Sequence, residues 1–349
     1  MTSDSSTTSD SSTTGATNAS AKPPCAFYSV CDSRFFPGMV ALLNSLRLIG
    51  HDERIFLVDA GLTAEQRRLL SDHVTLIPAP QNASVILLKQ LGPMKYPASV
   101  SILLDADIIV TRPLTELVAA ARSGRIVAFI DQEATEDRFF PEWSSLLGFE
   151  PLRRQPYLNG GQLVIPDSLR HRLLELWVEG QAKVDAQQTW HGKGSLSSPL
   201  YFGDQDVLNA LVATHFEPEE MRILEHRLAP FPPFPGLRLI DERRILCRYA
   251  DGTQPFMLHH ILAKPWLKTT RTTVYSLLLP RLLLAPDVAL RLEPDQLPLR
   301  LREGRLAVAD RRRANLQALI YSQSRRQLGR FGIRTRIAGW RRSRELDPV

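Results

Sequence analysis

The sequence predicts an α/β protein whose central sheet is largely parallel. Short apolar runs of strand length alternate with longer segments whose apolar residues recur at helical spacing. Almost uniformly apolar runs are typical of strands that helices cover on both faces. The composition, 44% hydrophobic and 23% charged, is that of a folded globular protein, so wholesale disorder and fibrous structures are excluded.

The alternation begins with a strand at residues 26–31, between a Pro-Pro pair and an Asp-Ser pair. A helix is expected over 37–46, because a proline stands at its start and the apolar residues keep helical spacing. The later strands are expected at 54–58, 74–77, 100–104, 126–130 and 161–165. The later helices are expected at 63–72 and from about residues 114 and 168.

Three regions are expected along the chain. Residues 1–24 form a Ser/Thr-rich leader without aromatic residues, and we expect it to be disordered. Residues 25–270 form the α/β domain, and residues 271–349 form a helical, arginine-rich extension. The leucine-rich run at 277–284 is interrupted by Pro280 and Arg281, so we expect a packed pair of helices there rather than a membrane span.

The cysteines and the lack of a membrane signal bear on location. Three cysteines are too few for a disulfide framework, and Cys25 and Cys31 are predicted about 20 Å apart along one strand. A reducing compartment is therefore expected. The chain shows neither a signal-peptide pattern nor a run of about 18 apolar residues. We expect a cytoplasmic protein, with peripheral attachment to the inner face of the membrane as a further option.

Positive charge is concentrated in the extension. Between Arg300 and Arg344 there are 14 arginines and two acidic residues, so this stretch carries +12 while the whole chain carries +6. The arginines interleave with Phe331, Ile333 and Trp340. This pattern suits either a solvated basic face or an anionic membrane surface. Nucleic-acid binding is not expected, because the remainder of the chain is net acidic and offers no broad basic face.

Two carboxylates follow an apolar strand in Leu-Leu-Asp-Ala-Asp-Ile-Ile-Val at 103–110. Asp105 and Asp107 stand two residues apart and can face one hard cation, while small Ala106 lets a ligand approach the backbone. Magnesium and manganese are usually held by carboxylates together with substrate phosphate. The alternatives are a solvated strand end with a turn-forming aspartate and a haloacid-dehalogenase aspartate, for which Ile109 replaces the expected threonine.

A second polar group follows an apolar strand in Pro-Phe-Met-Leu-His-His-Ile-Leu-Ala-Lys-Pro-Trp at 255–266. Either His259 or His260 could complete a metal shell, and Lys264 could neutralise a diphosphate as a point charge. A purely structural role for the two histidines is the alternative that this segment leaves open.

Two further segments carry polar side chains beside glycines. Tyr-Leu-Asn-Gly-Gly-Gln at 157–162 places Asn159 and closely approachable backbone before a buried strand, as recognition of sugar hydroxyls requires. Phe-Gly-Asp-Gln-Asp-Val-Leu-Asn at 202–209 opens a helix with Asp204, Gln205 and Asp206. An aspartate in that position is commonly a helix cap.

These four segments, in this order, resemble the retaining glycosyltransferases of family 8, which include glycogenin and bacterial lipopolysaccharide galactosyl- and glucosyltransferases. The likeness spans roughly residues 26–268. It implies a GT-A fold, a UDP-hexose donor, and a glycan, lipopolysaccharide or other lipid-linked acceptor. It also implies Mn²⁺, or Mg²⁺, held by Asp105, Asp107 and His259, with His260 as the alternative. Two departures are the short spacing from His259 to Lys264 and Lys89 near the position of a family arginine.

The resemblance also implies roles for single residues. Asp32, Lys89 and Ala106 are expected to contact the donor, and Lys264 its diphosphate. The residues expected at the transferred sugar are Asn159, Gly160, Asp131, Asp204 and Gln205, the last two beside its reactive carbon. The competing interpretation is a nucleotide-sugar-binding or scaffolding protein of the same fold that has no catalytic activity.

Overall fold

The computed structural model describes residues 22–81, 88–131, 137–190, 192, 194–261, 263–268, 270–302 and 304–330. Two sequence predictions lie outside these ranges. They are the disordered leader as far as residue 21 and the arginine-rich stretch that contains Phe331 and Trp340.

Helices and strands alternate through the first two thirds of the chain, as predicted. The strands are β1 (Ala26–Cys31), β2 (Arg54–Asp59), β3 (Thr75–Pro78), β4 (Val100–Leu104), β5 (Ile108–Val110), β6 (Ile126–Ile130), β7 (Leu158–Pro166), β8 (Met221–Leu224), β9 (Arg238–Asp241), β10 (Leu246–Arg248) and β11 (Met257–His259). The α-helices are α1 (Phe36–Leu48), α2 (Ala64–Leu70), α3 (Leu91–Lys95), α4 (Thr115–Arg122), α5 (Glu142–Leu147), α6 (Asp167–Gln181), α7 (Asp204–His215), α8 (Val274–Leu284) and α9 (Arg305–Arg330).

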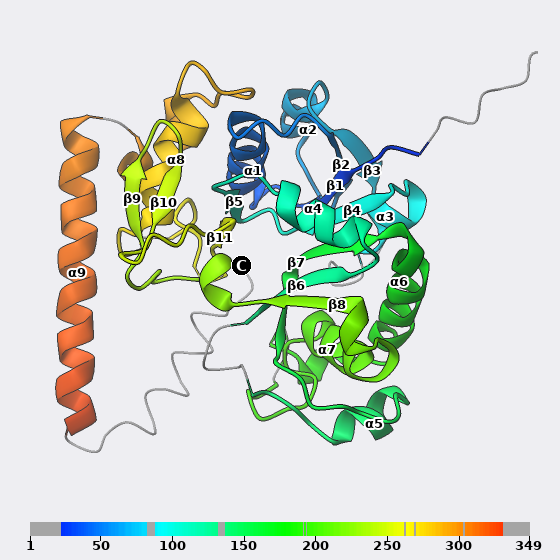
Figure 1. Cartoon of the computed structure of the whole chain (residues 1–349). Coiled ribbons are helices and arrows are strands. Elements are labelled where there is room, and N and C mark those ends of the chain that lie inside the picture. Colours follow the sequence, from blue (N-terminus) through cyan, green and yellow to red (C-terminus); the bar gives the residue numbers. More distant parts are fainter. Residues whose placement is uncertain are drawn as a thin grey trace, which may run out of the picture.

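Within the described residues, seven strands form the central sheet in the order β3-β2-β1-β4-β7-β6-β8 (Figure 1). Neighbouring strands pair in parallel except β7, which runs antiparallel to both β4 and β6. The predicted α/β fold with a mostly parallel central sheet is therefore confirmed. Since β1 and β4 are parallel neighbours, the residues that follow them lie at one edge of the sheet, where ligands bind in such folds.

Helices cover both faces of the sheet and form two apolar cores. On one face, alternate residues of β1 and β4, such as Phe27 and Ile102, pack with α1, α4 and α8. On the other face, Tyr28 and Leu103 pack with α6 and α7. Uniformly apolar strands were the sequence signal for this burial on both faces.

A separate two-stranded ribbon follows the end of β4. After β4 the chain turns through Asp105 to Asp107 and enters β5, which pairs antiparallel with β11. The register places His259 opposite Ile108. This pairing brings the histidine segment to the acid pair, although the two are far apart in the sequence.

The expected pair of helices around Pro280 is wrong, because α8 is one continuous helix. Its proline costs an internal hydrogen bond, about 3 kcal/mol. The side chains of α8 are almost all buried, and each buried leucine contributes about 1.5–3 kcal/mol, which outweighs that cost. The amide of Asn44 in α1 donates to the carbonyls of Leu282 and Leu290, at 2.6 and 2.7 Å, and fixes this packing.

The three cysteines are buried, and none of them forms a disulfide. Among the described helices, none combines the length and the apolar composition that a membrane crossing needs.

Candidate functional site

Asp105 and Asp107 lie in a tight turn at the end of β4. The Asp105 amide donates to the Gly161 carbonyl at 2.8 Å, and the Ile108 amide donates to the Asp105 carbonyl at 3.1 Å. The first bond continues the β4–β7 pairing by one residue, and the second closes the turn. These backbone hydrogen bonds therefore fix the positions of the two aspartates in the turn.

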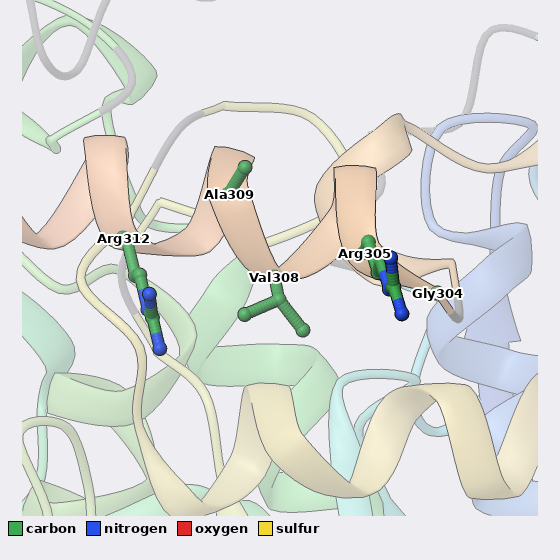
Figure 2. A pocket seen from close by; sticks show the side chains of 5 residues that line it. All are labelled: Gly304, Arg305, Val308, Ala309 and Arg312. Carbon is green, nitrogen blue, oxygen red and sulfur yellow. The ribbon is translucent and has the colours of Figure 1, made fainter.

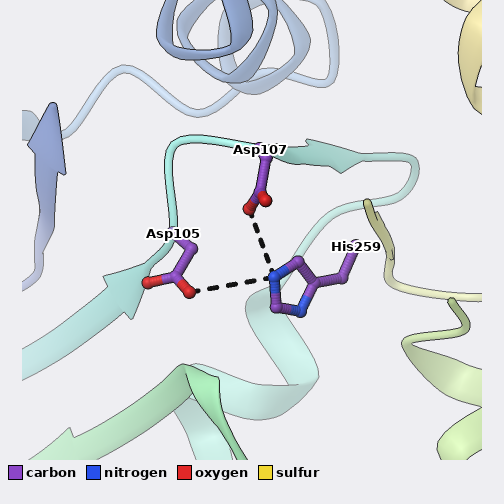
Figure 3. Close-up of side chains that lie close together, drawn as sticks. All are labelled: Asp105, Asp107 and His259. Carbon is purple, nitrogen blue, oxygen red and sulfur yellow. Dashed lines mark ion pairs between the residues drawn. The ribbon is translucent and has the colours of Figure 1, made fainter. Parts of the chain in front are cut away.

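The ribbon of β5 and β11 delivers His259 to this turn (Figure 3). Its Nε2 lies 3.2 Å from Asp107 Oδ1 and 3.8 Å from Asp105 Oδ2. One ligand atom from each of the three residues lies within 4.8 Å of the others. Two carboxylates and an imidazole thus converge on a space of the size that one divalent cation needs.

The donor set fits a divalent cation. Asp107 Oδ1 is buried but accepts no hydrogen bond in the described structure, and such an atom is costly unless a ligand satisfies it. Burial opposes ionisation of Asp107, but Lys264 and His259 outweigh it and hold the pKa of this carboxyl well below its usual value. Burial, together with the Asp107 charge, raises the pKa of Asp105. Carboxylate oxygens suit hard divalent cations such as manganese and magnesium.

His260, the alternative ligand, takes another position. Its ring packs edge-on against Tyr275 of α8, with centroids 4.8 Å apart, and next to Phe234. Burial and the charge of Lys264 lower its pKa to about 4. Of the two histidines, His259 is the one in the three-residue group with the acid pair.

Two lysines flank the carboxylates. Lys264 donates to Asp107 and to the His260 carbonyl. Lys89 lies 2.9 Å from Asp105 Oδ1, 3.1 Å from Asp204 Oδ2 and 3.2 Å from the Gly160 carbonyl oxygen. Burial opposes its charge, but Asp105 and Asp204 raise its pKa above the ordinary lysine value. Lys89 thereby links the acid pair to the start of α7.

Gln205 joins three of the predicted sugar-site residues. Its Oε1 accepts from the Gly160 amide at 2.9 Å and from Asn159 Nδ2 at 3.2 Å, and its Nε2 donates to Asp131 Oδ2 at 2.9 Å. These bonds fix the orientation of the amide and make one polar wall from β6, β7 and α7. Asp204 lies beside this wall and does not cap α7, whose first turn has no side-chain cap.

Asp32 and Ala106 complete the predicted set. Asp32 follows β1, and its Oδ1 accepts from the amides of Arg34 and Phe35, both at 2.9 Å. Trp266 Nε1 donates to the Arg34 carbonyl at 2.8 Å, so this turn contacts the Lys-Pro-Trp segment. Ala106 is buried between the two acids. The structure thus brings most of the predicted residues together, while the Asp32 side chain is engaged with its own turn.

Gly161 is required for the close approach of the metal-ligand candidates. A Cβ at this position would lie 2.3 Å from His259 Cε1 and 2.8 Å from Asp105 Oδ2. We expect Gly161→Ala to weaken Mn²⁺ binding at least about tenfold, because the ligands must move apart. Isothermal titration calorimetry with Mn²⁺ measures this. Gly160→Ala is the matched control, since its Cβ would meet only Gln205 at ordinary contact distance; equal losses in both variants would contradict the argument.

A buried ion pair that sequence analysis missed supports the start of α7. Asp206 accepts from Arg138 Nε at 2.7 Å and Nη2 at 2.9 Å, from the Tyr157 hydroxyl at 2.7 Å and from the Phe202 amide at 2.7 Å. Arg138 also donates to the carbonyls of Leu196 and Ser198. The only signal in the sequence was an acidic residue in the first turn of a helix, which indicated no partner.

Three solved structures are similar to this chain. The structure of WbbM, described as a bifunctional glycosyltransferase, matches with a TM-score of 0.51 and 15% identity over 78% of this chain and 52% of that one. An active-site mutant of LgtC matches with a TM-score of 0.49, 17% identity and coverages of 77% and 98%. A structure of the galactosyltransferase LgtC in complex with donor and acceptor sugar analogues matches with a TM-score of 0.46 and 18% identity. The match covers 75% of this chain and 98% of that one.

The chain therefore shares a GT-A-like glycosyltransferase fold, with a candidate divalent-metal group at the sheet edge. At these identities the likeness concerns the fold. No protein-family model matches the sequence, and neither does any curated protein.

Proposed function

We propose that this protein is a metal-dependent retaining glycosyltransferase that moves a hexose from a UDP-sugar to an acceptor hydroxyl of a glycan, lipopolysaccharide or other glycoconjugate. The observation that carries the proposal is the group formed by Asp105, Asp107 and His259, flanked by two lysines at the end of β4. The same fold occurs in the glycosyltransferase WbbM, which supports the reaction class.

Asp105, Asp107 and His259 would hold Mn²⁺ or Mg²⁺. A divalent ion there would act as a Lewis acid that neutralises charge on the diphosphate leaving group. Two observations support this assignment. Asp107 Oδ1 is a buried acceptor without a hydrogen bond among the described residues, and most of the ligand atoms are oxygens.

Lys264 and Lys89 supply the fixed positive charge. Both already form ion pairs with carboxylates at the site, so their ammonium groups are held there before a donor binds. A diphosphate beside the acid pair would accept hydrogen bonds from Lys264, which stabilise the departing nucleotide without transferring a proton. Lys89, which lies 3.1 Å from Asp204 Oδ2, would hold this carboxylate in position beside the donor.

The polar wall of Asn159, Gly160, Gln205 and Asp131 would bind and orient the transferred sugar. Its amide and carboxylate groups hold one another, so little rearrangement is needed when a sugar replaces water. The negative charges of Asp131 and Asp204 would support the oxocarbenium-like sugar while the acceptor hydroxyl approaches. Retention of the anomeric configuration is part of this proposal.

Turnover of UDP-sugars tests the function. Purified protein is incubated with Mn²⁺ and a panel of UDP-hexoses, and UDP release is measured with and without a chelator. We expect release from at least one UDP-hexose that is lost with the chelator. Tight UDP binding without turnover of any donor would contradict the proposal and favour the nucleotide-sugar-binding protein.

A further inference from the structure

Helix α9 contacts the rest of the molecule through one side, where Asn315 Oδ1 accepts a hydrogen bond from the Thr272 amide at 2.8 Å. Its buried side chains include only small ones, Ala307 and Ala314, within the part where side chains are described. Arg311 Nη1 donates to the carbonyls of Arg300 and Arg302 at 3.1 and 3.2 Å, which holds the first turns in place. In Figure 1, α9 stands beside α8 and the β9–β10 hairpin, and its later half extends past them.

The opposite side of α9 exposes large aliphatic side chains, and we call it the outer face. The exposed fractions are 39% for Val308, 57% for Leu316, 53% for Leu319 and 55% for Ile320. Val308, Arg312, Leu316 and Leu319 follow at three- and four-residue spacing and so share one stripe. Such a cluster on a surface helix marks an interaction site.

Arginines are interspersed with these aliphatic side chains. Arg305, Val308 and Arg312 project to the same side of the helix, around a shallow depression of about 650 Å³ (Figure 2). Helix α9 carries seven arginines and one acidic residue, Asp310, which pairs with Arg313 at 2.9 Å. The outer face therefore offers aliphatic surface and net positive charge together.

We propose that the outer face of α9 binds an anionic lipid surface. Guanidinium groups pair with lipid phosphates while the aliphatic side chains enter the boundary between headgroups and acyl chains. A second copy of the chain is a less suitable partner. The two α9 helices would carry like charge, and their arginines would face one another in the interface. A polyanion such as nucleic acid would pair with the arginines but leave the aliphatic side chains in water. The proposal does not depend on glycosyl transfer.

Vesicle flotation with the full chain tests this binding. We expect the wild-type protein to bind vesicles rich in phosphatidylglycerol and to bind phosphatidylcholine vesicles at least about tenfold less. Arg312→Glu should lower partition onto the anionic vesicles about tenfold, and Leu316→Ser about fivefold. The matched controls are Arg122→Glu in α4 and Leu146→Ser in α5, exposed helical positions elsewhere that should have little effect.

A fluorescent reporter separates insertion from charge attraction alone. Leu316→Cys labelled with an environment-sensitive dye should shift to the blue on anionic vesicles, while labelled Leu146→Cys should not. The native cysteines are buried, which limits background labelling. Equal binding to both lipid compositions would overturn the proposal. So would variants of the outer face that partition like wild type, or a concentration-dependent dimer that Leu316→Ser disrupts.

Discussion

Replacing Asp105 with alanine is expected to lower kcat/KM for UDP-hexose turnover about a thousandfold, or about 4 kcal/mol of transition-state stabilisation. The variant removes one of the three candidate ligands, while Lys89 keeps Asp204 and the Gly160 carbonyl as partners. The fold should therefore persist while metal-dependent turnover is lost. Steady-state UDP release and Mn²⁺ binding followed by electron paramagnetic resonance both measure the effect.

Asp52→Ala is the matched control, because Asp52 is an exposed aspartate outside the site. It should retain wild-type turnover and Mn²⁺ binding. If Asp105→Ala released UDP at the wild-type rate, the metal assignment would be wrong. If it bound Mn²⁺ normally but lost turnover, Asp105 would act on the donor rather than on the metal.

Arg138→Ala is expected to lower the free energy of unfolding by about 3–5 kcal/mol, because it leaves the Asp206 carboxylate buried without its cation. Urea denaturation followed by far-UV circular dichroism measures this loss. Arg222→Ala removes an ion pair to Glu116 whose side chains are 30% and 49% exposed, and should cost less than about 1 kcal/mol. Similar losses in the two variants would contradict the argument.

The double variant Arg138→Ala/Asp206→Ala tests the cause of this loss. Without the carboxylate, no uncompensated charge remains buried, so the double variant should lose less than the sum of the two single losses. Strict additivity would mean that the two side chains contribute independently, and it would contradict the argument. Variants that remain folded should also show a raised KM for the donor, since this pair holds the turn before Asp204 and Gln205.

The sequence predicted the alternating layers because each buried strand is a continuous apolar run, and the helices between them show regular spacing. It also located the acid pair at the end of β4, since a charged residue directly after an apolar run marks the exposed end of a strand. Pairing partners were harder to predict. The ribbon strands β5 and β11 have three residues each, too few for a periodic signal.

Contacts between side chains distant in the sequence could not be predicted from local patterns. Nothing near Lys89 indicates that it reaches both Asp105 and Asp204. Arg138 likewise finds Asp206 only through tertiary packing. In α8, a local rule about proline gave the wrong answer, because burial against α1 outweighed the lost hydrogen bond.

The pairing of β5 with β11 has a consequence for biosynthesis. About 150 residues separate Ile108 from His259, so this contact has a high sequence separation and closes late. A ribosome-bound chain that has not yet exposed residues 257–259 can assemble every strand of the large sheet but lacks the imidazole. Cation affinity would therefore arise only near the end of synthesis, and nascent intermediates would be unable to sequester metal.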